Sequence, residues 1–120
     1  MAVSKINLSG GTANGRPIQV AATGTPGTLI HTASSTTGVQ DEIYLYANNT
    51  STSDVALTVE FGGTATSDQI VSAVVIPARA NSFPLPVVPG IPLTGGLVVR
   101  AFAGTTNVLN ISGFVNRITP

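Results

Sequence analysis

Hydrophobic and polar residues alternate along residues 54–61, where the pattern is more regular than elsewhere in the chain. Every second side chain there is apolar, which is the period of a β-strand with one buried and one exposed face. The pattern therefore predicts a half-buried strand. Its inward residues are Val55, Leu57, Val59 and Phe61, and its outward residues are Ala56, Thr58 and Glu60.

Residues 41–47 repeat the same period, and several other short segments are rich in β-branched residues. In the first segment, Ile43, Leu45 and Ala47 share one face, and Tyr44 and Tyr46 share the other. Further strands are predicted at residues 28–33, 69–77, 97–103 and 107–118. Gly113 predicts a β-bulge at which the inward register of the last strand switches. No window repeats apolar residues at helical spacing, so no helix is predicted.

Polar and glycine-rich turns separate these strands at intervals of about ten residues. Short strands at that spacing are typical of antiparallel sheets packed face to face. We therefore expect an all-β chain that folds as a single domain, an antiparallel β-sandwich with jelly-roll-like character, over residues 27–120.

The first 26 residues differ, because glycines are frequent and apolar residues come in isolated pairs. The pairs are Ile6 with Leu8 and Ile18 with Val20. Such a segment can form an ordinary edge strand, or an extended arm that adds a strand to a neighbouring subunit. The sparse apolar content favours an N-terminal arm over residues 1–26.

Residues 83–92 contain four prolines, Pro84, Pro86, Pro89 and Pro92, among apolar side chains. Proline has no backbone donor, so this segment cannot be a central strand paired on both sides and should follow an edge. Its apolar side chains could cover the domain's own core, but the low charge elsewhere favours contact with a neighbouring protein. These side chains are Phe83, Leu85, Val87, Val88, Ile91 and Leu93.

Charged residues make up 8% of the 120 residues, against about 25% in average domains, and the formal net charge is zero. The chain therefore has no basic footprint for nucleic acid and no polybasic patch for a membrane surface. Apolar residues make up 42%, more than a small domain can hide, so part of the surface should contact a partner. No apolar run at the N-terminus suggests a signal peptide, so synthesis in the cytoplasm is expected.

Candidate catalytic and metal-binding groups are few. His31 is the only histidine, the chain has no cysteine, and a hydrogen-bonded strand histidine is the expected role. Asp41 and Glu42 are neighbours and should point to opposite faces of a strand. Asp54, Glu60 and Asp68 are isolated and should be solvated. The sequence therefore predicts no enzyme, no cofactor and no metal.

Four further side chains are candidates for recognition. Tyr44 and Tyr46 could stack on a sugar, although a contact between subunits is favoured because tyrosine is enriched at interfaces. Arg100 and Arg117 lie among apolar residues and need a carboxylate or carbonyl partner if they are buried. They are candidates for interface contacts or for solvated positions on an outward strand face.

Five segments that together span most of the chain resemble capsid decoration, or cement, proteins of tailed bacteriophages. The segments are NGRPIQVAATGTPGTLIHTA (14–33), DEIYLYANNTS (41–51), LTVEFGG (57–63), PLPVVPGIPLTGGLVVRAFAG (84–104) and NISGFVNRI (110–118). The resemblance implies a β-rich homotrimer on the capsid exterior of the virion, bound to the major capsid protein and made in the host cytoplasm. It implies no catalytic residue.

On this interpretation the arm and the proline-rich segment share the contacts, one holding the trimer and the other gripping the shell. The contact candidates in the arm are Ile6, Leu8, Arg16 and Ile18, and those in the proline-rich segment are Phe83, Leu85, Val88 and Ile91. Two alternatives remain open. One is a glycan-binding adhesion module of a head fibre or tail that uses Tyr44 and Tyr46, and the other is a tail or connector β-sandwich.

Overall fold

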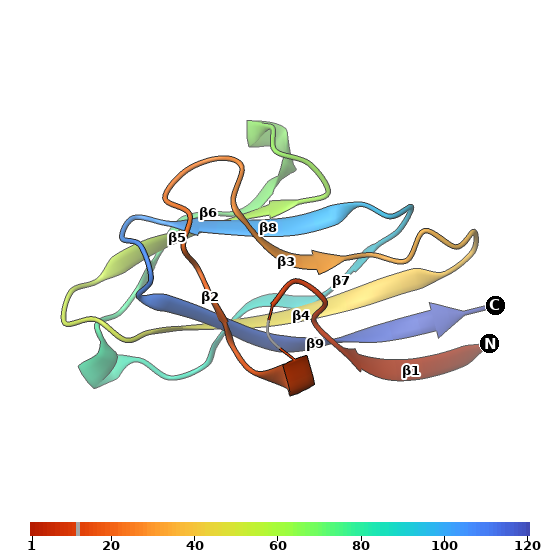
Figure 1. The fold of residues 1–120 in the computed structure, drawn as a ribbon, viewed down its shortest axis with the longest axis horizontal. Coiled ribbons are helices and arrows are strands. Elements are labelled where there is room, and N and C mark those ends of the chain that lie inside the picture. Colours follow the sequence, from red (N-terminus) through yellow and green to blue (C-terminus); the bar gives the residue numbers. More distant parts are fainter. Residues whose placement is uncertain (12) are drawn as a thin grey trace.

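Two antiparallel sheets pack face to face in the computed structural model, which describes residues 1–11 and 13–120 (Figure 1). The first sheet has the strand order β1-β9-β4-β7, and β2 pairs with the same strand β9; the second has the order β3-β8-β5-β6. The prediction of an antiparallel β-sandwich is confirmed. Within the predicted arm, position 12 lies outside the described residues.

Strands β3, β4, β5, β6, β8 and β9 agree closely with the segments predicted as strands, whereas β1 and β2 lie in the region predicted as an arm. Glycine-rich or polar turns set the strand ends. The first sheet contains β1 (Ala2–Asn7), β2 (Ile18–Gln19), β4 (Gln40–Asn49), β7 (Leu85–Leu93) and β9 (Leu109–Thr119). The second contains β3 (Thr28–Thr32), β5 (Val55–Phe61), β6 (Gln69–Ile76) and β8 (Val98–Ala103). Short 3-10 turns are η1 (Ala13–Gly15), η2 (Thr66–Asp68) and η3 (Arg79–Asn81). No helix in the described part of the chain has the length and apolar character needed to cross a bilayer.

The core lies between the sheets and is built from the inward positions of both. Ile43, Leu45 and Leu57 are fully buried, as the alternation predicts, and Phe61 is half-buried against the same cluster. Burying such side chains removes apolar surface from water at about 25 cal/mol per Å², which is the main stabilising contribution in a domain of this kind. Other fully buried residues are Val20, which directly follows β2, and Ile30, Val99, Leu109, Ile111 and Val115 of the remaining strands.

Thr58 and Glu60 are buried, so the prediction that these even positions of β5 face solvent is wrong. The strand β5 lies between β8 and β6, and other segments cover its outer face. The Thr58 hydroxyl accepts a hydrogen bond from the backbone of Ala73 in β6, and the Glu60 carboxylate accepts bonds from the loop before β3. The alternation of apolar and polar residues identified the two faces of β5. It could not show that a loop and the neighbouring strand cover the face that carries Thr58 and Glu60.

Gly113 is not a bulge, in contrast to the prediction. The pairing of β4 with β9 runs without a shift from Gln40–Ile118 to Asn49–Leu109, and Gly113 faces Leu45 within it. A Cβ atom at position 113 would overlap the carbonyl oxygen of Tyr44, and the φ angle there is +150°. Glycine is therefore required because the backbones of two strands approach closely.

The proline-rich segment forms β7, which is an edge strand as predicted. Its pairing with β4 shifts register twice, between Ile43 and Tyr44 and between Leu45 and Tyr46. Prolines and bulges both interrupt the row of donors that an edge would offer to another strand. Val88 points into the domain's own core and is 1% exposed. At least this residue of the segment therefore covers the core of its own domain, which is the alternative that the sequence leaves open.

Much of the predicted arm belongs to the sandwich within this chain. The strand β1 pairs with β9 along residues 114–119, and Ile18 and Val20 are buried in the core. Figure 1 shows β1 beside the last part of β9, with both chain ends on the same side of the molecule. Within a single chain, residues 2–7 therefore form an edge strand, which is the other option that the sequence leaves open.

Replacing Gly113 with alanine should lower the free energy of unfolding by about 2–4 kcal/mol, because the added Cβ forces β4 and β9 apart at a strained φ. Gly24→Ala is the matched control, since no heavy atom lies within 4 Å of a Cβ built there. That control should change stability by less than about 0.5 kcal/mol. Urea denaturation of both variants tests this, and equal stabilities would contradict the close-approach argument.

Candidate functional site

A chain of polar side chains crosses the interior and joins four segments far apart in the sequence. Ser9 follows β1, His31 lies in β3, Asp41 lies at the start of β4, and Arg117 lies near the end of β9. The Oγ atom of Ser9 is 3.1 Å from Nδ1 of His31, and Nε2 of His31 is 2.8 Å from Oδ2 of Asp41. Arg117 donates to both oxygens of Asp41, from Nε at 2.8 Å and from a terminal nitrogen at 2.9 Å.

Asp41 is fully buried and its neighbour Glu42 is half-buried, so the two carboxylates point to opposite faces of β4, as predicted. Burial raises the pKa of the Asp41 carboxyl, but the hydrogen bonds from Arg117 and His31 outweigh it and hold the pKa at about 2, below the ordinary 3.8. The hydrogen bond between Arg117 and Asp41 also raises the pKa of Arg117. Asp41 is therefore a carboxylate at neutral pH, held by a two-pronged guanidinium contact and an imidazole.

The hydrogen bonds define the tautomer of His31. Its Nδ1 accepts from the backbone N–H of Ser9 at 3.2 Å, so Nε2 carries the proton and donates to Asp41. The order serine, histidine, aspartate is also that of a nucleophilic triad. Here, however, a backbone N–H already uses the lone pair that would act as the base, and the histidine ring is fully buried. The arrangement suits a structural clamp that attaches the segment after β1 to β3.

A second buried carboxylate, Glu60, anchors the loop before β3. It accepts hydrogen bonds from the Thr25 hydroxyl and, at 2.7 Å, from the backbone N–H of Gly27. Arg100 donates to the carbonyl oxygen of Gly27 at 3.2 Å. Both Arg100 and Arg117 therefore have the carbonyl or carboxylate partner that their apolar surroundings require. In the part of the chain that the structure describes, no three histidine or acidic side chains group as a metal site.

Tyr44 and Tyr46 lie half-buried on the outer face of the first sheet, as the alternation predicts. Tyr44 stacks on Phe114 with ring centroids 4.6 Å apart and an angle of 15° between the rings. The Lys5 ammonium lies 4.7 Å from the centre of the Phe114 ring, and Tyr44 donates to Glu42 at 2.7 Å. The Tyr44 and Phe114 rings thus form part of a ladder across three strands, which leaves less aromatic surface for stacking on a sugar.

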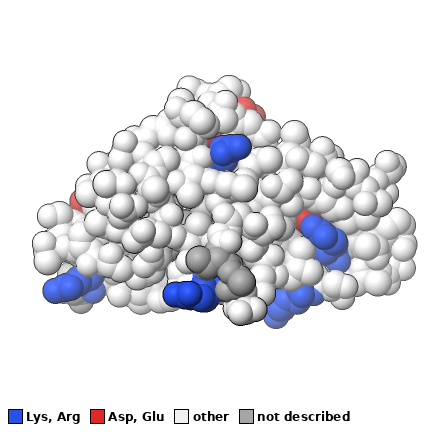
Figure 2. Space-filling view, in the orientation of Figure 1, with Lys and Arg blue, Asp and Glu red and all other residues white. Residues whose placement is uncertain are grey.

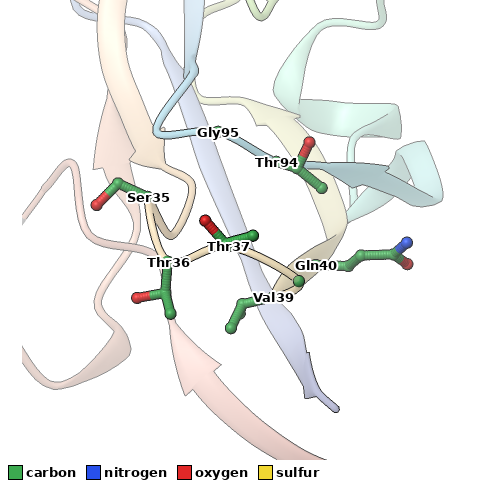
Figure 3. Close-up of a pocket in the computed structure, with 8 residues that line it drawn as sticks. Ser35, Thr36, Thr37, Val39, Gln40, Thr94 and Gly95 are labelled. Carbon is green, nitrogen blue, oxygen red and sulfur yellow. The ribbon is translucent and has the colours of Figure 1, made fainter.

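A polar hollow of about 280 Å³ lies where the β3–β4 loop meets the turn between β7 and β8. Apart from Val39, its lining consists of hydroxyl side chains, one amide side chain and glycines, and it includes no titratable group. Figure 3 shows that its hydroxyl groups point in different directions and not toward a common centre. This arrangement is poorly suited to orienting a small ligand. The residues are Ser35, Thr36, Thr37, Gly38, Val39, Gln40, Thr94 and Gly95.

A groove of about 260 Å³ separates β6 and β7, the edge strands on one side of the sandwich, and its lining is mainly apolar. It is lined by Ile70, Val71, Ser72, Val74, Pro86 and Val87. Ile70, Val74 and Val75 of β6 are 42%, 46% and 59% exposed, and Phe83, two residues before β7, is 60% exposed. We call Ile70, Val74, Val75 and Phe83 the apolar edge. Figure 2 shows one face of the molecule, most of which is neither basic nor acidic.

The predicted contact residues fall into different environments. Phe83 and Arg16 are exposed, whereas Ile18 and Val88 are core residues that a partner cannot reach in this structure. The remaining aliphatic candidates are half-buried against the core, namely Ile6, Leu8, Leu85 and Ile91.

Two features of the surface and interior were not predicted from the sequence. Ser9 was not identified as a partner of His31, and no local signal joins positions 22 residues apart. Ile70, Val74 and Val75 were not identified as contact residues, although the absence of charge from their segment was a signal that could have been used.

Replacing Asp41 with asparagine should lower the free energy of unfolding at pH 7 by about 3 kcal/mol, because Arg117 and His31 lose a buried anionic partner. The folded pKa of Asp41 is depressed, so its contribution is complete above about pH 4 and disappears as the pH falls through about 2. The difference in the free energy of unfolding between wild type and variant should therefore decrease by about 2 kcal/mol between pH 5 and pH 2. Urea denaturation across this range measures the difference. A difference that does not change with pH would show that it does not come from the ionisation of Asp41.

Comparisons of the chain with family models, with curated proteins and with solved structures find no match. The resemblance to phage decoration proteins therefore stays a prediction from the sequence. A function for this chain has to be inferred from its own exposed surfaces and buried polar groups.

Proposed function

We propose that this chain is a structural subunit of a tailed-phage head, which decorates the capsid exterior and stabilises it by bridging neighbouring capsomers as a homotrimer. The observation that carries the proposal is the apolar edge along β6 and the start of β7. Four large apolar side chains are 42% to 60% exposed there, on a chain with 8% charged residues. Exposed apolar surface of this kind is typical of a protein interface.

The groove beside the apolar edge supports contact with another protein. Val74 and Ile70 line one wall and Pro86 and Val87 line the other, so an apolar side chain from a partner could enter between the two sheets. A single contact of this size would be weak. Many copies docked on a repeating shell would nevertheless be retained, because each link raises the effective concentration of the next.

The buried polar groups support a structural role without chemistry of its own. Asp41, Glu60 and His31 each hold backbone or side-chain groups of the domain itself. All three are fully buried, and neither the polar hollow nor the groove includes them. We therefore propose that the chain is not an enzyme and acts without a cofactor, with the major capsid protein and its own copies as partners.

Val74→Lys should weaken binding to capsid shells of the phage that encodes this chain by about tenfold or more, because a charge would enter an apolar contact. Leu97→Lys is the matched control, since Val74 and Leu97 are 46% and 47% exposed and only Val74 lines the groove. Co-sedimentation with shells over a range of protein concentrations measures the affinity.

The control should bind like the wild type, and thermal unfolding should show that both variants fold. Equal binding by both variants would show that the apolar edge is not part of the contact with the shell. Failure of the wild-type protein to bind or stabilise shells would overturn the proposed function itself.

A further inference from the structure

The strand β1 is held to the domain by little more than its pairing with β9. All its residues are exposed except Ile6, which is half-buried against the core, and Val3 is 58% exposed. Its outer edge has no partner strand among the described residues, because β1 is the end strand of its sheet. Edge strands with few buried contacts are among the least stable parts of a fold.

The place that β1 occupies is nonetheless well defined. Residues 114–119 of β9 pair with β1 on one side, and residues 114–118 also pair with β4 on the other. Strand β2 covers only Ile111 and Asn110, further along the edge that β1 occupies. Removal of β1 would leave six residues of β9 without a partner on that edge. An open strand edge readily accepts another strand.

The chain is anchored directly after β1, so the departure of β1 would remove only the Ile6 side chain from the edge of the core. The backbone N–H of Gly10 donates to the carbonyl of Ile30 at 2.9 Å, and the Ser9 hydroxyl accepts from the N–H of Thr32 at 2.9 Å. The ring of His31 holds Ser9 as well, through both its backbone N–H and its hydroxyl. Residues 7–8 are therefore the positions at which the direction of the chain could change while Ser9, Gly10 and the buried Ile18 stay in place.

We infer that β1 is exchanged between copies of this chain, each copy placing residues 2–7 on β9 of a neighbour. The contacts on β9 are specific for this strand: Lys5 lies over the Phe114 ring, and Ile6 faces Val115 and packs against the core. A second copy supplies the same contacts, which a foreign strand would have to reproduce. Both chain ends lie on the same side of the molecule (Figure 1), so copies that meet there bring β1 and β9 together.

Exchanged and unexchanged pairings share these contacts, so the local concentration of copies decides between them. Donation in one direction from copy to copy forms a ring where the rotation between copies closes. Only the number of three copies in that ring rests on the proposed function. On a crowded shell surface the exchanged form is favoured, because neighbouring copies are held close together.

The absence of cysteine from the sequence allows a direct test with engineered disulfides. Val3 and Ile118 face each other in the register of β1 and β9. Two single variants, Val3→Cys and Ile118→Cys, are co-expressed, purified at high concentration and oxidised. Exchange predicts a covalent link between the two different chains on a non-reducing gel. The double variant V3C/I118C should then give covalent oligomers.

The control pair is Asn48→Cys with Asn110→Cys, which face each other across β4 and β9 and cannot exchange with β1. Its double variant should link within one chain, and its co-expressed single variants should give no link above background. A V3C/I118C protein that runs as an internally linked monomer, together with unlinked V3C and I118C single variants, would overturn the exchange.

If that internally linked monomer still binds shells, the proposed function stands without exchange. If exchanged oligomers form but do not bind shells, the exchange stands and the proposed function fails. Deletion of residues 2–7 provides a second readout: it should abolish the oligomer measured by light scattering while far-ultraviolet circular dichroism still shows the sandwich. An unchanged oligomer after this deletion would also overturn the exchange.

Discussion

The buried carboxylate of Asp41 is the constraint on which the rest of the structure depends. It accepts hydrogen bonds from Arg117 of β9, from His31 of β3 and from the backbone of Ser34, so one group joins both sheets and the loop between them. Through His31 the same connection reaches Ser9 and the segment after β1. Removing one partner from such a set leaves a charge without compensation in the interior, which is far more costly than losing a surface ion pair.

This clamp also explains how the N-terminal region is divided. Ser9 and Gly10 are bonded to β3, and Ile18 and Val20 are buried in the core. Residues 2–7, in contrast, lie on the edge of the sheet and outside the clamp. A rigid attachment next to a weakly held strand keeps the domain folded whether or not that strand is in place. The division makes the exchange of β1 compatible with a stable core.

The edge strands of the two sheets differ in how far they can pair with a further strand, and these differences affect how the protein could assemble. On β7 the prolines remove donors, and on β6 a displaced backbone at Ala73, with φ +50°, bonds to Thr58. Both devices hinder continuous pairing with a foreign strand. The contact we propose at β6 and β7 is accordingly made by apolar side chains, and the contact at β1 by backbone pairing. Two chemically distinct surfaces at different edges would let one protein bind its own copies and a shell at the same time.

The sequence by itself determined the strands after residue 27 and the packing of their inward faces, because a period of two in apolar residues is a local property. Ile43, Leu45, Leu57 and Val59 were found in this way, and the prolines of β7 identified an edge for an equally local reason. Only the tertiary structure decided which polar groups are buried and which partners they have. Glu60 lies at an outward position of its strand and is buried because a loop 33 residues away in the chain covers it. The fold brings four distant segments together, so that His31 bonds to Ser9 and Asp41, and Asp41 bonds to Arg117. No local pattern in the sequence encodes these contacts.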